Sequence, residues 1–111
     1  MDKKILVVDD AMFMRSIIRK ILKEAGYTQV WEAQDGEKAM ELFREVSPDL
    51  VLLDITMPGR SGLEVLEEML GLVPNVRVIM CSAVGQEMMI QKALTIGASD
   101  FIVKPFKADE F

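Results

Sequence analysis

The sequence predicts an α/β fold, a doubly wound sandwich in which a five-stranded parallel sheet carries helices on both faces. The first observation is that segments 4–8 and 50–53 are almost continuous apolar runs, as expected for strands buried on both faces of a parallel sheet. The second is that strand-like and helix-like patterns alternate along all 111 residues. A chain of this length holds one domain with a single core.

The expected strands differ in how much apolar surface they carry. Segment 29–33 alternates between apolar and polar residues and is expected at an edge of the sheet, whereas segment 50–54 is expected at its centre. The expected strands are 4–8, 29–33, 50–54, 76–81 and 100–103.

Helices are expected where apolar residues recur every three or four positions. The first apolar stripe runs to Ala25, and Gly26 ends the helix. Pro48 ends the second helix, because the residue before proline is pushed out of the helical region. In the last helix Met88 helps to widen the apolar arc, and Gly97 closes the helix. The expected helices are 12–25, 36–46, 62–70 and 85–96.

The composition excludes several kinds of site. Histidine is absent and Cys81 is the only cysteine, which excludes imidazole or cysteine metal sites, a Ser-His-Asp triad, an internal disulfide and a phosphohistidine on this chain. The net charge of −5 and the scattered basic residues argue against nucleic-acid binding. No apolar run is long enough to span a membrane and no signal-peptide pattern opens the chain, so a cytoplasmic protein is expected.

Polar residues follow the strands that can be central in the sheet. The carboxyl ends of parallel strands meet at one edge, where ligands bind in open α/β sheets, so these side chains are expected to lie together. Oxygen ligands without His or Cys favour a hard cation, and Mg²⁺ combines a few carboxylates with water and a phosphate oxygen. The residues are Asp9, Asp10, Asp54, Ser82 and Lys104.

The carboxylates at this edge would repel one another. Two carboxylates about 4 Å apart repel by roughly 4 kcal/mol at an effective dielectric constant of about 20, so the group should need a cation or bind protons. Asp54 stands alone on the central strand and is the best candidate for a nucleophile toward phosphorus, which leaves Asp9 and Asp10 to hold the metal. Lys104 would neutralise a phosphoryl oxygen, and Ser82 could donate a hydrogen bond to it.

Five short motifs, in order and correctly spaced over essentially the whole chain, resemble the receiver domain of two-component response regulators. Segments 9–15, 55–58 and 81–83 further resemble the stand-alone chemotaxis regulators of the CheY group. The resemblance implies a flavodoxin-like sheet of order 2-1-3-4-5 and one receiver domain over residues 1–111. The motifs are Asp9-Asp10, Asp54, Met57-Pro58 with Gly62, Ser82-Ala83 and Lys104-Pro105-Phe106.

The resemblance also implies roles for these residues. Asp54 would accept a phosphoryl group from the phosphohistidine of a sensor histidine kinase. Asp10, Asp54 and the backbone carbonyl of Thr56 would ligate Mg²⁺, and Asp9 would act through water. Lys104 would pair with the phosphoryl group.

Further residues belong to the binding and switching parts of the implied site. Ser82 would move toward the phosphoryl group, and Thr56 and Ala83 would contact the bound groups. Phe101 matches an aromatic switch residue of the family, and the alternative is a core phenylalanine on a short strand. Since Phe101 lacks the hydroxyl of tyrosine, switching would depend on packing alone. Thr56 replaces the Asn of some chemotaxis members, so a hydrolysis rate does not carry over.

The implied function is signalling, with no enzymatic activity beyond self-phosphorylation by small phosphodonors and self-dephosphorylation. A flagellar motor component is the implied output partner, and a phosphatase is a further candidate partner. The alternative is the receiver domain of a larger regulator whose effector domain has been removed.

Rival classes fit the residues less well. A haloacid-dehalogenase-like phosphatase would need an acid where Thr56 stands, and more than 111 residues. A flavodoxin-like cofactor binder would need an anion-friendly loop where Asp9 and Asp10 repel anions. A degenerate receiver that serves only as an interaction module would not need the complete set of site residues.

The C-terminal residues raise two further expectations. The Lys104-Pro105 peptide bond is expected to be cis, as the family implies. Residues 107–111 begin a fifth helix that the sequence does not complete, so the chain is expected to be a receiver truncated within that helix. The apolar stripe beside the first helix would then be covered by something else, which makes self-association through this face a candidate.

Overall fold

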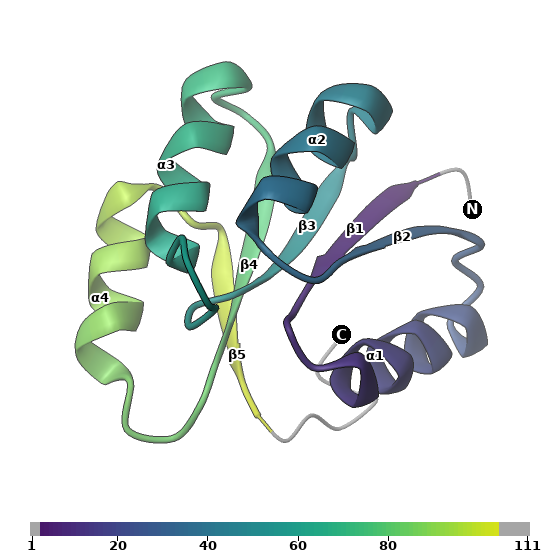
Figure 1. Ribbon diagram of the computed structural model, residues 1–111, viewed down its shortest axis with the longest axis horizontal. Helices are drawn as coiled ribbons and strands as arrows, with labels where there is room; N and C mark the ends of the chain where they lie inside the picture. The colour runs from purple at the N-terminus through teal and green to yellow at the C-terminus, as the bar shows by residue number, and fades with distance from the viewer. Residues whose placement is uncertain (1–2, 105–111) are drawn as a thin grey trace.

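The computed structural model describes residues 3–104, and these residues form a five-stranded sheet with helices on both faces. The predicted α/β class is confirmed (Figure 1). In chain order the elements are β1 (Lys4–Val8), α1 (Met12–Glu24), β2 (Gln29–Ala33), α2 (Gly36–Val46), β3 (Leu50–Asp54), α3 (Gly62–Leu72), β4 (Arg77–Ser82), α4 (Glu87–Ile96) and β5 (Asp100–Val103).

The sheet has the expected order, β2-β1-β3-β4-β5, and every neighbouring pair is parallel. The apolar strand β3 is central, and the less apolar β2 lies at an edge, as its sequence predicts. Because all strands run the same way, the ends of β1, β3, β4 and β5 meet at one edge of the sheet. The residues that follow these strands are therefore brought together by the topology alone.

The helices divide unequally between the faces of the sheet. Helices α2, α3 and α4 cover one face and α1 lies on the other (Figure 1). Alternate residues of β3 face opposite ways, as strand geometry requires: Leu53 packs in the same cluster as Phe43 of α2, and Leu52 packs with Ile18 of α1. Both leucine side chains are almost completely buried, so the strand that ends in Asp54 is packed on both faces.

Two helix ends differ from the sequence-based expectation. Helix α1 ends at Glu24, and Ala25 is exposed, so the apolar stripe stops one turn earlier than expected. Helix α3 continues to Leu72, beyond the expected end at residue 70, because Gly71 is accommodated as a helical residue.

The β4–α4 connection also differs. Strand β4 includes Ser82, which pairs with Val103 of β5. Helix α4 begins at Glu87, because Gly85 has a φ of +95°, which is incompatible with a right-handed helix. Met88 was expected to widen the buried apolar side of this helix, and this prediction is wrong because Met88 is exposed.

Several expectations fall outside residues 3–104. The configuration of the Lys104-Pro105 bond and the fifth helix expected from residue 107 concern residues that are not described. Within the described part of the chain, the side chains of Ile5, Cys81 and Ile102 on the α1 face are buried. Self-association through this face stays a prediction. Among the described helices, none combines the length and the apolar character needed to span a bilayer.

Candidate functional site

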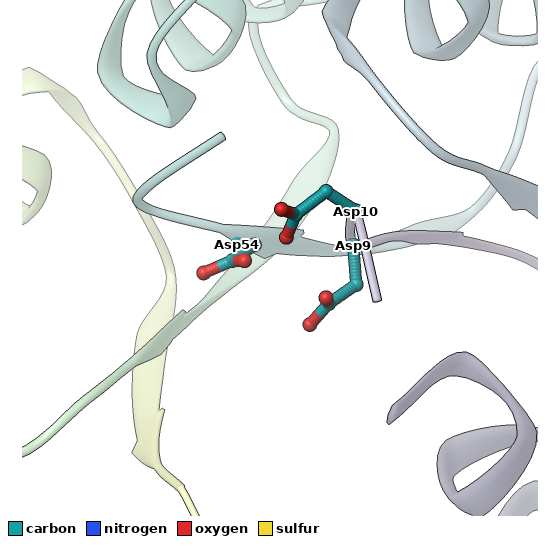
Figure 2. A group of neighbouring side chains, drawn as sticks. All are labelled: Asp9, Asp10 and Asp54. Carbon is teal, nitrogen blue, oxygen red and sulfur yellow. The ribbon is translucent and has the colours of Figure 1, made fainter. Parts of the chain in front are cut away.

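Three aspartates gather where β1 and β3 end. Asp9 and Asp10 follow β1, and Asp54 is the last residue of β3 (Figure 2). One carboxylate oxygen of each residue lies within 4.8 Å of the others. Asp9 and Asp54 are buried, whereas Asp10 is exposed to solvent. The cluster predicted from the strand ends is therefore present in the fold.

Lys104 enters this cluster from the end of β5. Its Nζ atom lies 2.9 Å from Oδ2 of Asp9 and 3.2 Å from Oδ2 of Asp54. The backbone N–H of Lys104 donates to the carbonyl of Ser82 at 2.7 Å, which extends the β4–β5 ladder and fixes where the side chain starts. The repulsion expected among the acids is thus partly offset by an ammonium group of the same chain.

Burial is the main cause of the raised pKa of Asp54. It raises the pKa of the Asp54 carboxyl from 3.8 to about 6, and the nearby charge of Asp9 adds to this rise. Lys104 acts in the opposite direction through its charge and hydrogen bond. Burial also lowers the pKa of Lys104, but the hydrogen bond to Asp9 and the two carboxylate charges outweigh it, and the net shift is upward. Desolvation, more than carboxylate repulsion, is therefore the cost of placing Asp54 here.

Asp9 accepts hydrogen bonds at both side-chain oxygens and at its backbone carbonyl. Its Oδ1 accepts from the backbone N–H of Ala11 at 2.9 Å, and its Oδ2 accepts from Lys104. Its backbone carbonyl accepts from Nη1 of Arg15 at 2.6 Å, and Nε of Arg15 lies 3.1 Å from Oε1 of Glu32. Both side-chain oxygens of Asp9 are thus already engaged, whereas Asp10 remains open to solvent.

The other residues predicted for the site stand around Asp54. Ser82 is fully buried, and its Oγ has no hydrogen-bond partner within residues 3–104. Thr56 lies in the loop after β3, and its backbone N–H donates to Oδ1 of Asp54 at 3.4 Å. Ala83 follows Ser82 directly and is exposed. Burying a hydroxyl without a hydrogen-bond partner costs free energy of folding. A bound group with acceptor oxygens, such as a phosphoryl group, would provide Ser82 with such a partner.

Phe101 does not lie in the core. The residue is 40% exposed, so the alternative of a core phenylalanine is wrong. The reason is that β5 is an edge strand with only β4 as a neighbour. Phe101 lines a cavity of about 310 Å³ together with Ile90 and Leu94.

Sequence reasoning missed Gln86, which contacts two predicted site residues. Its Oε1 accepts from the Ala83 N–H at 2.6 Å, and its Nε2 donates to Oγ1 of Thr56 at 2.6 Å. The expected helix 85–96 would have placed Gln86 inside a helix. Gly85 was the available signal, because glycine before a helical pattern often marks a turn with positive φ.

Comparison with known proteins assigns the chain to a family. The family model for the response regulator receiver domain matches residues 5–111. The chain belongs to this family, a signalling domain of two-component systems. Receiver domains typically bind Mg²⁺ at an acidic pocket, and the cluster of Asp9, Asp10 and Asp54 is a pocket of this kind.

Relatives and solved structures agree with this assignment. The chemotaxis protein CheY of Listeria monocytogenes is 52% identical over 106 residues, which cover 96% of this chain and 89% of the relative. The crystal structure of the receiver domain of NtrX from Brucella abortus superposes with a TM-score of 0.92 at 38% identity and covers 96% of this chain and 90% of that one. The longer NtrX chain gives a TM-score of 0.93 at 38% identity, with 99% of this chain matching 25% of that chain.

Proposed function

We propose that this chain accepts a phosphoryl group on Asp54 from a sensor histidine kinase and thereby changes the surface formed by α4 and β5. The observation that carries the proposal is the surroundings of Asp54. Its carboxylate is buried, lies 3.2 Å from the ammonium of Lys104, and adjoins the strand that ends in the unpartnered hydroxyl of Ser82. These are the groups that a carboxylate needs to bind and stabilise a doubly charged phosphoryl group.

In the transfer, an oxygen of Asp54 forms a bond to phosphorus while the P–N bond of the kinase phosphohistidine breaks. The electron pair of the broken bond stays on the imidazole nitrogen. With the second ring nitrogen protonated, the leaving group is neutral imidazole. Lys104 would pair with a phosphoryl oxygen as a point charge, and Ser82 would turn its hydroxyl toward another.

The donor set at the site fits Mg²⁺, since it is made of oxygen atoms alone and includes the exposed Asp10. Asp10, Asp54 and the carbonyl of Thr56 would hold the ion. Asp9 would act through water, because both of its side-chain oxygens already accept hydrogen bonds. When bound, Mg²⁺ supplies positive charge that offsets the acids and the phosphoryl oxygens.

The output would be read at α4 and β5. Phe101 is partly exposed beside a cavity of about 310 Å³, so it has space into which to turn once Ser82 moves toward the phosphoryl group. Spectra recorded with beryllofluoride, which stands in for the phosphoryl group, should change at Phe101 and along α4. Changes confined to the neighbours of Asp54 would count against this switch.

We place the protein in chemotaxis because its relatives include proteins named chemotaxis protein CheY. A histidine kinase would be the phosphodonor, a flagellar motor component the reader, and a phosphatase a further partner, all in the cytoplasm. The formal net charge of −5 gives this domain no basis for binding nucleic acid.

A second role has one observation in its favour. The receiver of NtrX matches this chain as 25% of a longer protein, so this domain could equally serve a larger regulator with an effector domain. Direct binding of the phosphorylated domain to a flagellar motor protein would favour the stand-alone role.

Mass spectrometry of the intact protein tests the phosphoryl acceptor. Acetyl phosphate with Mg²⁺ should add one phosphoryl group to the wild-type protein and none to Asp54→Asn. Asp100→Asn, a change at an exposed acid on β5, should retain the gain in mass. A wild-type protein without any gain would be a degenerate receiver, and an equal gain in Asp54→Asn would place the phosphoryl group elsewhere.

A further inference from the structure

The side chain of Gln86 ties together two loops at the mouth of the site. Its Oε1 lies 2.6 Å from the backbone nitrogen of Ala83, and its Nε2 lies 2.6 Å from Oγ1 of Thr56. The orientation of the amide is not ambiguous, because a backbone N–H can only donate and therefore needs the oxygen of Gln86 as its acceptor. The β4–α4 loop and the β3–α3 loop are thus joined by one residue.

The N–H of Ala83 is a donor that could serve a group bound to Asp54. Asp54 and Cys81 are paired in register on β3 and β4, Ser82 is the last residue of β4, and Ala83 follows it directly. The backbone N–H of Ala83 therefore follows directly after the unpartnered hydroxyl of Ser82. A phosphoryl group on Asp54 would present three acceptor oxygens at this edge, and in this structure the amide oxygen of Gln86 holds the Ala83 donor instead.

We propose that Gln86 is an internal competitor for the phosphoryl group, and this inference rests on the proposed phosphorylation of Asp54. In the unphosphorylated protein its amide oxygen takes the place of a phosphoryl oxygen on the Ala83 N–H. For the Ala83 N–H to bind a phosphoryl oxygen, its hydrogen bond to Gln86 must break. The Gln86 side chain is then no longer fixed at one end, which weakens its hydrogen bond to Thr56. Gln86 therefore lowers the affinity of the site for a phosphoryl group.

The position of Gln86 determines which parts of the protein are affected when its hydrogen bonds break. Gln86 is the N-cap residue of α4, so a change in its contacts acts on the first turn of that helix. It also lines the cavity of about 310 Å³ that Phe101 lines. Gly85, with a φ of +95°, precedes Gln86 and supplies the turn that lets the side chain fold back on Ala83. Release of Gln86 thus links the phosphoryl site to the proposed output surface through a single residue.

The first test needs no phosphodonor and no metal. Amide hydrogen exchange of Ala83 should be faster in Gln86→Ala than in the wild type, because the N–H loses its acceptor. Gln91→Ala is the matched control, since Gln91 is an exposed glutamine on α4 that lines the same cavity. Exchange at Ala83 should be unchanged in this control. Equal exchange in wild type and Gln86→Ala would overturn the contact itself.

The second test measures binding of beryllofluoride with Mg²⁺ by titration. Gln86→Ala should bind about threefold to tenfold more tightly than the wild type, the effect of removing one competing hydrogen bond. Gln86→Glu should bind more weakly than the wild type, because its carboxylate still accepts from Ala83 and also repels the anion. Gln91→Ala should match the wild type.

The outcomes separate this inference from the proposed function. Wild-type binding of beryllofluoride together with unchanged or weaker binding by Gln86→Ala would overturn the competitor role and leave phosphorylation of Asp54 standing. Failure of the wild type to bind beryllofluoride or to gain a phosphoryl group would overturn the proposed function, and the competitor role with it.

Discussion

Nζ of Lys104 lies 2.9 Å from Oδ2 of Asp9, and the two residues are separated by almost the whole length of the chain. The contact exists because β1 and β5 end at the same edge of a parallel sheet. Lys104 lies also 3.2 Å from Oδ2 of Asp54, so one ammonium serves the two buried acids of the cluster. The protein therefore carries an internal cation where Mg²⁺ is expected to bind.

Replacing Lys104 with Met should destabilise the metal-free protein and increase its response to Mg²⁺. Removing one partner of a buried charge leaves the other uncompensated, and we expect a loss of about 1–3 kcal/mol in the free energy of unfolding, since Lys104 is partly exposed. Mg²⁺ should restore more stability in this variant than in the wild type, because it can replace the missing charge. Urea denaturation with EDTA and with Mg²⁺ measures both effects.

The matched control is Lys38→Met, which breaks the exposed pair between Lys38 and Glu41. Exposed pairs contribute little, so its stability and its response to Mg²⁺ should stay close to those of the wild type. An identical gain from Mg²⁺ in Lys104→Met and wild type would mean that Lys104 does not compensate the acids.

Asp54→Asn should stabilise the metal-free protein at neutral pH and lose this advantage in acid. The pKa of Asp54 is raised from 3.8 to about 6 in the folded state, so between these values the folded protein binds a proton that the unfolded chain does not. Stability due to Asp54 therefore falls as pH rises from about 4 to about 6, by up to about 3 kcal/mol in all. Asparagine avoids this cost because it stays neutral at every pH.

Urea denaturation in EDTA at several pH values, from acid to neutral, checks this expectation. The difference between Asp54→Asn and wild type should be largest above pH 6 and small near pH 4. Glu24→Gln, at an exposed acid at the end of α1, should differ little from wild type at both ends of the range. A difference of constant size across the range would show that the charge of Asp54 is not its cause.

The sequence could predict those parts of the site that depend on strand direction. The apolar run of β3 indicates burial on both faces, burial on both faces indicates a parallel sheet, and a parallel sheet brings Asp9, Asp54 and Ser82 to one edge. None of these steps needs side-chain detail. The same reasoning placed Lys104 near the acids, but it could not show that Lys104 pairs with Asp9 as well as with Asp54.

Other features depend on local geometry that hydrophobic periodicity does not report. The contact between Gln86 and Ala83 requires the positive φ of Gly85 and one particular side-chain conformation. The exposure of Phe101 follows from the edge position of β5, which the apolar sequence of that strand conceals. Arg15 holds the carbonyl of Asp9 through a contact between α1 and the residue after β1 that has no fixed spacing in sequence.

Cys81 should react with thiol reagents only when the protein unfolds. It is 2% exposed, and burial raises its pKa to about 12, so the thiol is both inaccessible and protonated at neutral pH. Labelling with a disulfide reagent should be very slow in buffer and should reach one thiol per chain in denaturing urea. Rapid labelling in buffer would show that β4 opens far more readily than its buried position indicates.

Gly62→Ala should destabilise the fold and disturb the acid cluster together. Gly62 begins α3, and its N–H donates to the carbonyl of Ile55 at 2.8 Å. A Cβ at this position would lie 2.1 Å from the backbone oxygen of Asp54 and 2.8 Å from Cα of Ile55, and backbone atoms cannot move away as a flexible side chain would. We expect a loss of about 3 kcal/mol in the free energy of unfolding, at the upper end of what overpacking costs.

Gly71→Ala, in the same helix, is the matched control because, apart from its chain neighbours and the backbone of its own helix, no atom lies within 4 Å of its added Cβ. There alanine should stabilise the protein by about 0.5–1 kcal/mol through its higher helix propensity. Urea denaturation gives both values, and a Mg²⁺ titration followed by NMR shows whether the acids have moved. Since the clash in Gly62→Ala falls on Asp54 itself, its affinity for Mg²⁺ should drop while that of Gly71→Ala stays unchanged. Equal stability of the two variants would mean that α3 can move away from β3 without cost, which the buried contact between Leu53 and the residues of α3 opposes.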